Sequence, residues 1–466
     1  MTQNEWTELK FDRLNRITGV SSEKLVDKKI CVYINEEAFS YYSNQVMTIV
    51  AVTILSKWCN NISVNVSDKL LFTHTHNKGQ LLSAVLKRIV EDNDTFNNIG
   101  FNDSNFKPDC ILSIGRLEFN SAIPVIYINS NGWIAGYGKN SFEVIGKTED
   151  LNPIGASFSA CLGNAALFKE LMSIEQEETF WNMFDLHSNK KIASTSSYAD
   201  IPFPDKLNIG NIVQIGCGAV GSSFDFILSL TNITGKLDLI DFDHVSIENL
   251  ISSLTFLEND AKKQALKIDA CERILKESKL NIYKHEGDYS SYIDAINYYN
   301  QYPDLILCLA NERNIWSSIQ HNYPPTVLHG TTTASWGLNV GRHFPLYDGC
   351  IVCRFGINSN NYVPICGSAV VEKQNEISEE KLGVLPFLSP ATAVLIFAEL
   401  IKLNMESVNL TKNFSEFSMK ASVSADFVNS FFARRPTCPI CTQQDSSLHY
   451  QLNSKSKYAN LSPLIT

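Results

Sequence analysis

The sequence predicts an α/β fold made of two domains in one chain, each with a parallel sheet. Strand-like apolar runs alternate with helix-like runs through both halves of the 466 residues, and this alternation is typical of parallel sheets with helical crossovers. A polar, serine-rich stretch with two prolines separates the halves at residues 187–206, and such a composition is disfavoured in helix and strand. We therefore expect a first domain at 1–186, a second at 207–445 and a tail without clear pattern at 446–466.

Matching elements follow one another in the same order in the two halves. In the first half, we expect strands at 30–34, 62–66 and 108–115, and long helices at 39–58 and 155–172. In the second half, we expect strands at 212–215, 237–240 and 303–310, and helices at 222–230 and 388–403. A glycine beside a tryptophan, Gly132-Trp133 and Trp336-Gly337, marks a turn in each half. The shared order favours duplication of one plan over a chance likeness between two generic domains.

Composition excludes several classes of protein. The net charge of −10 argues against a nucleic-acid or anionic-membrane binder, because phosphate groups attract basic surfaces. The longest apolar runs, such as 46–55, are shorter than the roughly 20 residues of a membrane span. No secretory signal opens the chain, so the twelve cysteines indicate reduced thiols, metal ligands or a nucleophile. We expect a cytoplasmic protein.

A glycine-rich motif lies between an apolar strand and a helix in the second half. Gly216, Gly218 and Gly221 have the spacing G-x-G-x-x-G, which lets a Rossmann-like backbone approach a phosphate at a helix N-terminus. Asp241 ends the next apolar run, at the spacing expected of a carboxylate that binds ribose. The motif alone fits nicotinamide, flavin or adenylate chemistry equally well. In the first half, the corresponding residues 35–40 lack glycine and contain two carboxylates, so we expect no nucleotide there.

The cysteines divide into pairs and a single residue. Cys350 and Cys353 form one C-x-x-C pair, and Cys438 and Cys441 form another. Two such pairs can complete a four-cysteine zinc site, and a redox C-x-x-C is the competing interpretation. Cys366 stands apart in a stretch without periodicity, where it is either a small buried hydrophobe or an accessible nucleophile.

The segment after the glycine motif resembles a family signature. Residues 241–250 resemble the D-x-D-x-V-x-x-x-N-L pattern of the ThiF-type family, which includes the activating enzymes of ubiquitin-like proteins, and the resemblance extends over 211–441. It implies ATP and Mg²⁺ binding, adenylation of a carboxyl-terminal glycine and, in many members, thioester formation on a cysteine. It also implies an inactive adenylation-like domain followed by an active one.

Roles for individual residues follow from the same resemblance. The three glycines would hold ATP, Asp241 its ribose, and Cys366 the thioester. Asn249 and Lys267 would act on the phosphates, and Asp243 and Asn311 would complete the cofactor site. Arg13 and Arg16 resemble an R-x-x-R arm that reaches the ATP of the other domain.

Two positions depart from the family pattern. Ser252-Ser253 replaces an arginine–glutamine pair, and Ala310 replaces the metal-binding aspartate. Magnesium prefers hard oxygen ligands, so Glu312, Asp243 or the phosphates would have to hold it.

Three functions remain in competition at this point. The leading hypothesis is a bacterial activating enzyme that serves a ubiquitin-like protein and a conjugating enzyme, in an operon of the antiphage-defence type. The second is a peptide-modifying adenylating enzyme similar to those of microcin biosynthesis, and the third is a zinc-stabilised scaffold without catalysis. The sequence leaves open whether the chain acts as a monomeric pseudodimer or as a homodimer.

Overall fold

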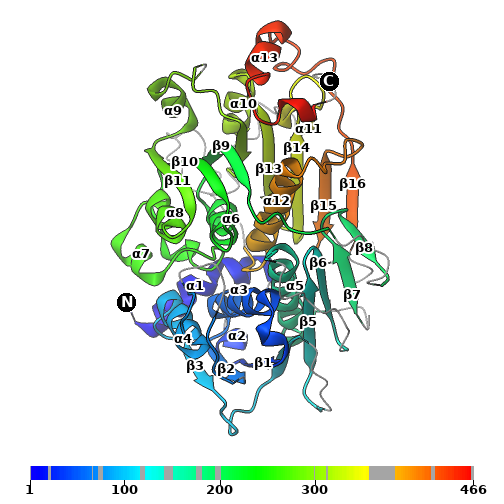
Figure 1. Cartoon of the computed structure of the whole chain (residues 1–466). Helices are drawn as coiled ribbons and strands as arrows, with labels where there is room; N and C mark the ends of the chain where they lie inside the picture. The colour runs from blue at the N-terminus through cyan, green and yellow to red at the C-terminus, as the bar shows by residue number, and fades with distance from the viewer. Residues whose placement is uncertain are drawn as a thin grey trace.

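The computed structural model describes residues 2–18, 23–65, 67–71, 77–115, 121–140, 151–174, 181–194, 201–298, 300–310, 313–355, 384–420 and 426–462. Each half of the chain forms its own eight-stranded sheet, and the two halves are stacked on each other (Figure 1). The predicted α/β class is therefore confirmed. No helix in the described ranges is both long and apolar enough to cross a bilayer.

The first sheet has the strand order β3-β2-β1-β4-β5-β6-β7-β8. Its strands are β1 (Lys29–Ile34), β2 (Asn61–Asn65), β3 (Asn98–Phe101), β4 (Cys110–Ile114), β5 (Val125–Asn131), β6 (Ile134–Gly138), β7 (Asn182–Asp185) and β8 (Lys190–Ile192). The pairs from β3 to β5 are parallel, whereas those from β5 to β8 are antiparallel. The expectation of a parallel sheet is thus correct for the first five strands only.

The second sheet repeats this plan in the order β11-β10-β9-β12-β13-β14-β15-β16. Its strands are β9 (Asn208–Ile215), β10 (Thr234–Asp241), β11 (Lys279–Glu286), β12 (Leu305–Cys308), β13 (Thr326–Thr332), β14 (Gly337–His343), β15 (Phe414–Ser418) and β16 (Phe427–Ser430). The change from parallel to antiparallel pairing again comes after the fifth strand of the order. Both glycine–tryptophan signals mark the turn at this change, as a duplicated plan requires.

The helices of the described residues vary widely in length. They are α1 (Gln3–Thr18), α2 (Glu23–Val26), η1 (Ala38–Ser40), α3 (Tyr42–Trp58), α4 (Leu82–Asn93), α5 (Ile154–Leu171), α6 (Ala219–Ser229), η3 (Ile247–Asn249), α7 (Glu258–Lys263), α8 (Lys267–Leu275), α9 (Tyr289–Ala295), α10 (Arg313–His321), α11 (Ile351–Phe355), α12 (Leu388–Asn404), α13 (Ser446–Asn453) and η4 (Ala459–Leu461).

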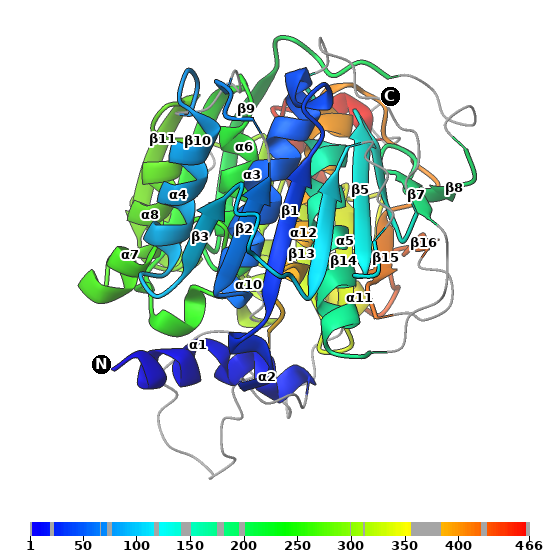
Figure 2. The same ribbon diagram turned by 90° about the horizontal axis from the view of Figure 1, so that it is seen from below.

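Four long helices separate the two sheets and fuse the cores of both halves. Helices α3 and α5 of the first half face α6 and α12 of the second, with α5 packed directly on α12 (Figures 1 and 2). The ring of Phe168 on α5 lies 6.1 Å from that of Trp336 and 5.9 Å from that of Phe387. The Tyr42 hydroxyl donates to the carbonyl of Leu230 across the same interface at 2.6 Å. One continuous hydrophobic core therefore spans both halves.

The N-terminal helix crosses from the first half to the second. Helix α1 packs against η3, which follows β10 in the chain. Its Trp6 is buried in a small cluster with Val245, Leu250 and Phe256 of the second half. The segment that carries the expected arginine arm is thus anchored beside the loop that carries Asn249.

Two segments that we expected to lack structure contain regular elements. Strand β8 lies inside the expected linker 187–206 and is the edge of the first sheet. The expected tail 446–466 contains α13 and η4. The Tyr458 hydroxyl donates to the carbonyl of Ile209 at 2.9 Å, and the Ser456 hydroxyl donates to that of Asp304 at 2.8 Å. Buried polar anchors of this kind fix the tail on the second domain.

Candidate functional site

The glycine motif lies at the point where the strand order of the second sheet reverses direction. The chain passes from β9 to β10 on one side, whereas β12 flanks β9 on the other. In open α/β sheets, ligands bind in the crevice at the carboxyl ends of such strands. Gly216 follows β9 with a φ of +94°, and a Cβ built on it would lie only 2.8 Å from the backbone nitrogen of Ala310, which follows β12. The two strand ends are therefore in direct contact at this crevice.

The three glycines of the motif have different surroundings. A Cβ on Gly221, in the first turn of α6, would collide with the carbonyl oxygen of Gly216. Around a Cβ on Gly218, no atom of the described residues other than its two chain neighbours lies within 4 Å. Gly218 also forms the N-cap of α6, where free N–H groups and the helix dipole favour an anion. Gly216 and Gly221 are thus required for packing, whereas Gly218 faces open space.

Asp241 connects the glycine loop to the end of β10. Its Oδ2 accepts the backbone N–H of Cys217 at 2.7 Å, and its Oδ1 accepts that of Asp243 at 2.8 Å. Burial raises the pKa of Asp241, against the charge of Lys267 and these two hydrogen bonds, which lower it. Each carboxylate oxygen has two lone pairs, so the residue can hold the loop and still accept a ribose hydroxyl.

Lys267 places a buried cation beside these carboxylates. Its Nζ lies 2.6 Å from Oδ2 of Asp243, and only 9% of its side chain is exposed. Burial lowers the pKa of Lys267, but the charges of Asp241 and Asp243 outweigh this effect and raise it above its ordinary value. The ammonium group therefore stays charged at neutral pH. It has three donors, and Asp243 uses one of them.

Asn249 and the two serines that follow it have structural contacts of their own. Oδ1 of Asn249 accepts the backbone N–H of Ser246 at 2.9 Å and closes η3. The hydroxyl of Ser253 lies 2.7 Å from that of Ser222 on α6, and both Ser252 and Ser253 are buried. No positive charge stands where the family pattern has its arginine.

The remaining cofactor and catalytic candidates are only partly described. Arg16 pairs with Asp12 of its own helix at 2.8 Å, whereas the side chain of Arg13 is not described. Cys366, Asn311 and Glu312 lie outside the described residues. Their roles, like those of the glycine-loop residues toward ATP, remain predictions.

The Ala310 position offers no metal ligand. Its carbonyl accepts the indole N–H of Trp316 at 3.0 Å, and its methyl group cannot coordinate an ion. Asp243, another expected ligand, is paired through Oδ2 with Lys267. The described residues therefore do not fit a Mg²⁺ ion held by protein carboxylates.

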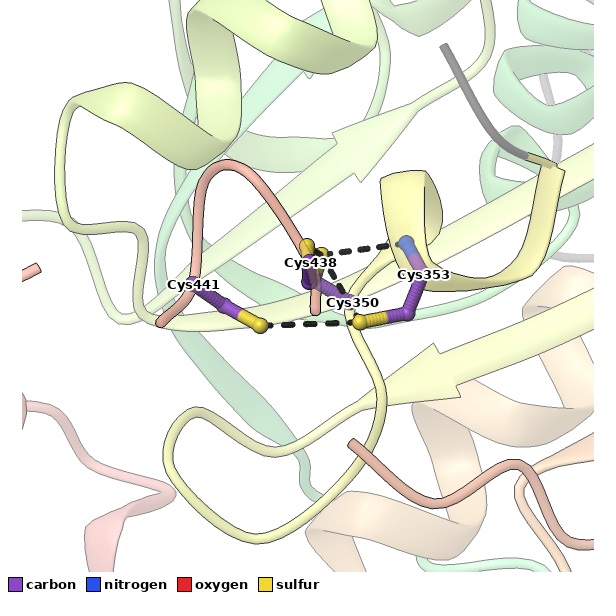
Figure 3. Close-up of side chains that lie close together, drawn as sticks. All are labelled: Cys350, Cys353, Cys438 and Cys441. Atoms are coloured by element: carbon purple, nitrogen blue, oxygen red, sulfur yellow. Dashed lines mark hydrogen bonds between the residues drawn. The ribbon is translucent and has the colours of Figure 1, made fainter. Parts of the chain in front are cut away.

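The four paired cysteines meet in one cluster (Figure 3). The Sγ atoms of Cys350 and Cys353 are 3.6 Å apart, those of Cys350 and Cys438 are 3.7 Å apart, and those of Cys353 and Cys441 are 3.5 Å apart. Sulfurs bound tetrahedrally to zinc at about 2.3 Å lie roughly 3.8 Å from one another. Hydrogen bonds from the Cys350 and Cys441 thiols lower the pKa of Cys353, and a thiolate is the form that binds metal. The cluster therefore fits a closed, structural zinc ion.

A second buried cluster was missed by the sequence analysis. The ligand atoms of Cys217, Asp225 and Cys271 lie within 4.8 Å of one another beneath the glycine loop. Gln214 donates from Nε2 to Oδ2 of Asp225 at 3.1 Å. Burial raises the pKa of Asp225 to about 7. Asp225, the only charged residue of helix α6, was the signal that could have indicated this cluster.

Comparison with known proteins agrees with the sequence resemblance. The model of the ThiF family matches residues 196–440, which is more than half of the chain. Among solved structures, E. coli MccB with MccA-N7isoASN is 20% identical over 50% of this chain and 66% of that chain, with a TM-score of 0.38. E. coli MccB with ATP is 18% identical over 50% and 67%, with a TM-score of 0.37.

A further solved structure, the microcin C7 biosynthetic enzyme MccB in complex with N-formylated MccA, is 15% identical over 68% of this chain and 97% of that chain, with a TM-score of 0.36. The first of these matches spans slightly less than two thirds of the MccB chain. A search of curated proteins gave no match. The match to more than half of its residues shows that the chain belongs to the ThiF family, a family of adenylating enzymes.

Proposed function

We propose that the chain activates the carboxyl terminus of a ubiquitin-like protein with ATP and then carries it as a thioester on Cys366. A conjugating enzyme is the proposed recipient, in a bacterial cytoplasm. The observation that carries the adenylation step is the open space at Gly218, at the N-terminus of α6 and beside a buried cation. A phosphate chain needs this combination of close backbone approach and positive charge.

In the proposed first step, a carboxylate oxygen of the terminal glycine attacks the α-phosphorus of ATP. The bond to the bridging oxygen breaks, and pyrophosphate leaves. Negative charge builds up on the phosphates during this step, and Lys267 and the N–H groups at the start of α6 would stabilise it. Asp241 would hold the ribose while it fixes the loop through Cys217.

In the proposed second step, the thiolate of Cys366 attacks the acyl carbon and AMP leaves. The segment that carries Cys366 begins after α11, whose Cys353 belongs to the zinc cluster, and ends before α12, which is packed in the central core. A bound zinc ion would hold the four cysteines in a fixed arrangement. Both ends of the segment are thus attached to rigid parts of the second domain.

In the first half, the loop after β1 corresponds to the glycine loop of the second half. Its residues support a purely architectural role for the first half. After β1, the N–H of Asn35 donates to the carbonyl of Ile114 at 3.0 Å, and the carbonyl of Glu36 accepts Nζ of Lys69 at 2.8 Å. Phe39 is 1% exposed there. The loop has two exposed carboxylates, which would repel a phosphate, and no glycine. We infer that nucleotide binds to the second half only.

One assay series tests the proposal. The full chain is mixed with ATP, magnesium and candidate ubiquitin-like proteins, and pyrophosphate exchange and a thiol-sensitive adduct are measured. We expect Cys366→Ala to abolish the adduct and keep exchange, Lys267→Ala to slow exchange by at least about tenfold, and the control Cys31→Ala to change neither.

Other results would favour the competing functions. Exchange without any adduct, for ubiquitin-like proteins and peptides alike, would favour peptide modification of the microcin type. A chain that binds no ATP would be a scaffold. An adduct that survives Cys366→Ala would contradict the assignment of the nucleophile.

A further inference from the structure

A polar cavity lies between the two halves and is lined by none of the residues of the glycine motif. It has a volume of about 230 Å³ and lies between the turn that joins β7 to β8 in the first half and α12, β14 and β15 in the second. Figure 1 shows these elements side by side. Asn189 of the turn, at a φ of +52°, donates from Nδ2 to Glu399 at 3.2 Å and to Ser415 at 3.1 Å. The cavity is therefore built by both halves.

Two buried cations line this cavity but share a single carboxylate. Lys402, which is 3% exposed, pairs with Glu399 at 2.6 Å. Arg342, which is 5% exposed, donates from Nη2 to the carbonyls of Asn409 at 3.1 Å and Lys412 at 2.8 Å. Its buried Nε has no hydrogen-bond partner in the described part of the chain. The charge of Arg342 also acts on the buried carboxyl of Asp348, which does not line the cavity. Burial of more cations than carboxylates around one cavity is costly, so a ligand that supplies negative charge would be stabilised here.

Further positive charge stands at the edge of the cavity. Lys190 and Lys412 also line it, so four cations face one carboxylate in a chain whose net charge is −10. Burial lowers the pKa of Lys412, and the charges of Lys190 and Lys402 lower it further. Burial and then Lys402 lower the pKa of His187, which keeps its ring neutral at pH 7. The cations repel one another, and an anion between them would relieve this repulsion.

We propose that this cavity binds a small phosphate-class oxyanion, inorganic phosphate or pyrophosphate, which links the first half to the second. Arg342 supplies directional donors for its oxygens, and Lys412 and Lys190 supply charge. The volume corresponds to that of roughly eight water molecules at about 30 Å³ each. It is below the roughly 300–1,000 Å³ of sites that enclose drug-sized ligands, so it suits a bare anion. The site is separate from the glycine loop and does not depend on the function proposed above.

Calorimetric titration of the full chain tests this site, at constant ionic strength maintained with sodium chloride. Phosphate, pyrophosphate and citrate are titrated separately. We expect saturable binding of one of the two phosphate compounds, about tenfold weaker in Lys412→Gln, because that change removes a charge-assisted contact. Arg342→Lys keeps the charge but loses the directional donors, and it should weaken binding as well. The matched control Lys87→Gln, on the exposed face of α4, should leave the affinity unchanged.

Lys267→Gln separates this site from the glycine loop. Binding that persists in Lys267→Gln supports the cavity, whereas binding lost in that variant and kept in Lys412→Gln would place the anion at the glycine loop and overturn the proposal. It is also overturned if neither phosphate compound binds at millimolar concentration, or if citrate binds more tightly than both.

Discussion

Replacement of single glycines by alanine separates packing from ligand binding in the glycine loop. In Gly216→Ala, the new methyl group would meet the backbone of Ala310 at 2.8 Å, and the residue would have to keep a φ of +94°. The backbone conformation alone costs about 1–2 kcal/mol, and with displacement of Ala310 we expect about 3 kcal/mol of lost stability. Gly218 has a φ of −71° and open space, so Gly218→Ala should change the free energy of unfolding by less than about 1 kcal/mol.

Gly218→Ala, the variant that should keep its stability, should lose affinity for ATP. The methyl group of Gly218→Ala would occupy the space into which a phosphate must come, so we expect at least about a tenfold loss of affinity, or about 1.4 kcal/mol. Urea unfolding measures the stability, and equilibrium binding at a temperature where all variants are folded measures the affinity. Gly100→Ala, in open surroundings on β3, is the matched control for both. Unchanged ATP affinity in Gly218→Ala would refute the placement of the phosphates.

Three further predictions concern the core, the metal and a buried carboxyl group. Phe168→Ala should cost about 3–5 kcal/mol and lower the stability of both halves in one urea transition; two separate transitions would contradict a shared core. Cys438→Ser should lower the zinc content measured by mass spectrometry and cost at least about 2 kcal/mol; an unchanged zinc content would exclude this cluster. Because the Asp225 carboxyl has its pKa raised to about 7 from about 4 in the unfolded chain, the folded state retains a proton between these pH values, and stability falls by a few kcal/mol as pH rises through that window. Asp225→Asn should remove this fall between pH 4 and 7, and an equal pH slope in both proteins would disprove it.

Local sequence signals located three strands in each half, which correspond to β1, β2, β4, β9, β10 and β12, and the glycine loop between β9 and α6. The G-x-G-x-x-G motif and Asp241 belong to one βαβ unit. The sequence alone therefore predicts that they lie at the carboxyl ends of two adjacent strands. The two C-x-x-C pairs lie 88 residues apart, yet their chemistry alone predicts that they meet. Both features can be recognised from the sequence, because their residues either lie close together in it or have a distinctive chemistry.

Features that depend on contacts between distant segments were not predictable in the same way. The composition of α3 predicts a helix, but not that all of its residues are buried, because the helices α4 and α5 that cover it lie elsewhere in the sequence. Cys271 lies on α8, and only the fold brings it to Asp225 on α6. Arg342 could not be identified from the sequence, because the residues that line the cavity come from four separate segments. Charge balance in three dimensions cannot be derived from a linear order of residues.

The central helix layer determines how this chain can be divided. Helix α3 is buried on every side, so a fragment that begins after the first half would expose the inner faces of α6 and α12 to water. At roughly 25 cal/mol for each Å², exposure of about 400 Å² of apolar surface would cost about 10 kcal/mol, which is comparable to the 5–15 kcal/mol by which domains are usually stable. We expect the second half prepared alone to aggregate or unfold. Point substitutions in the intact chain are therefore the better way to dissect its activity.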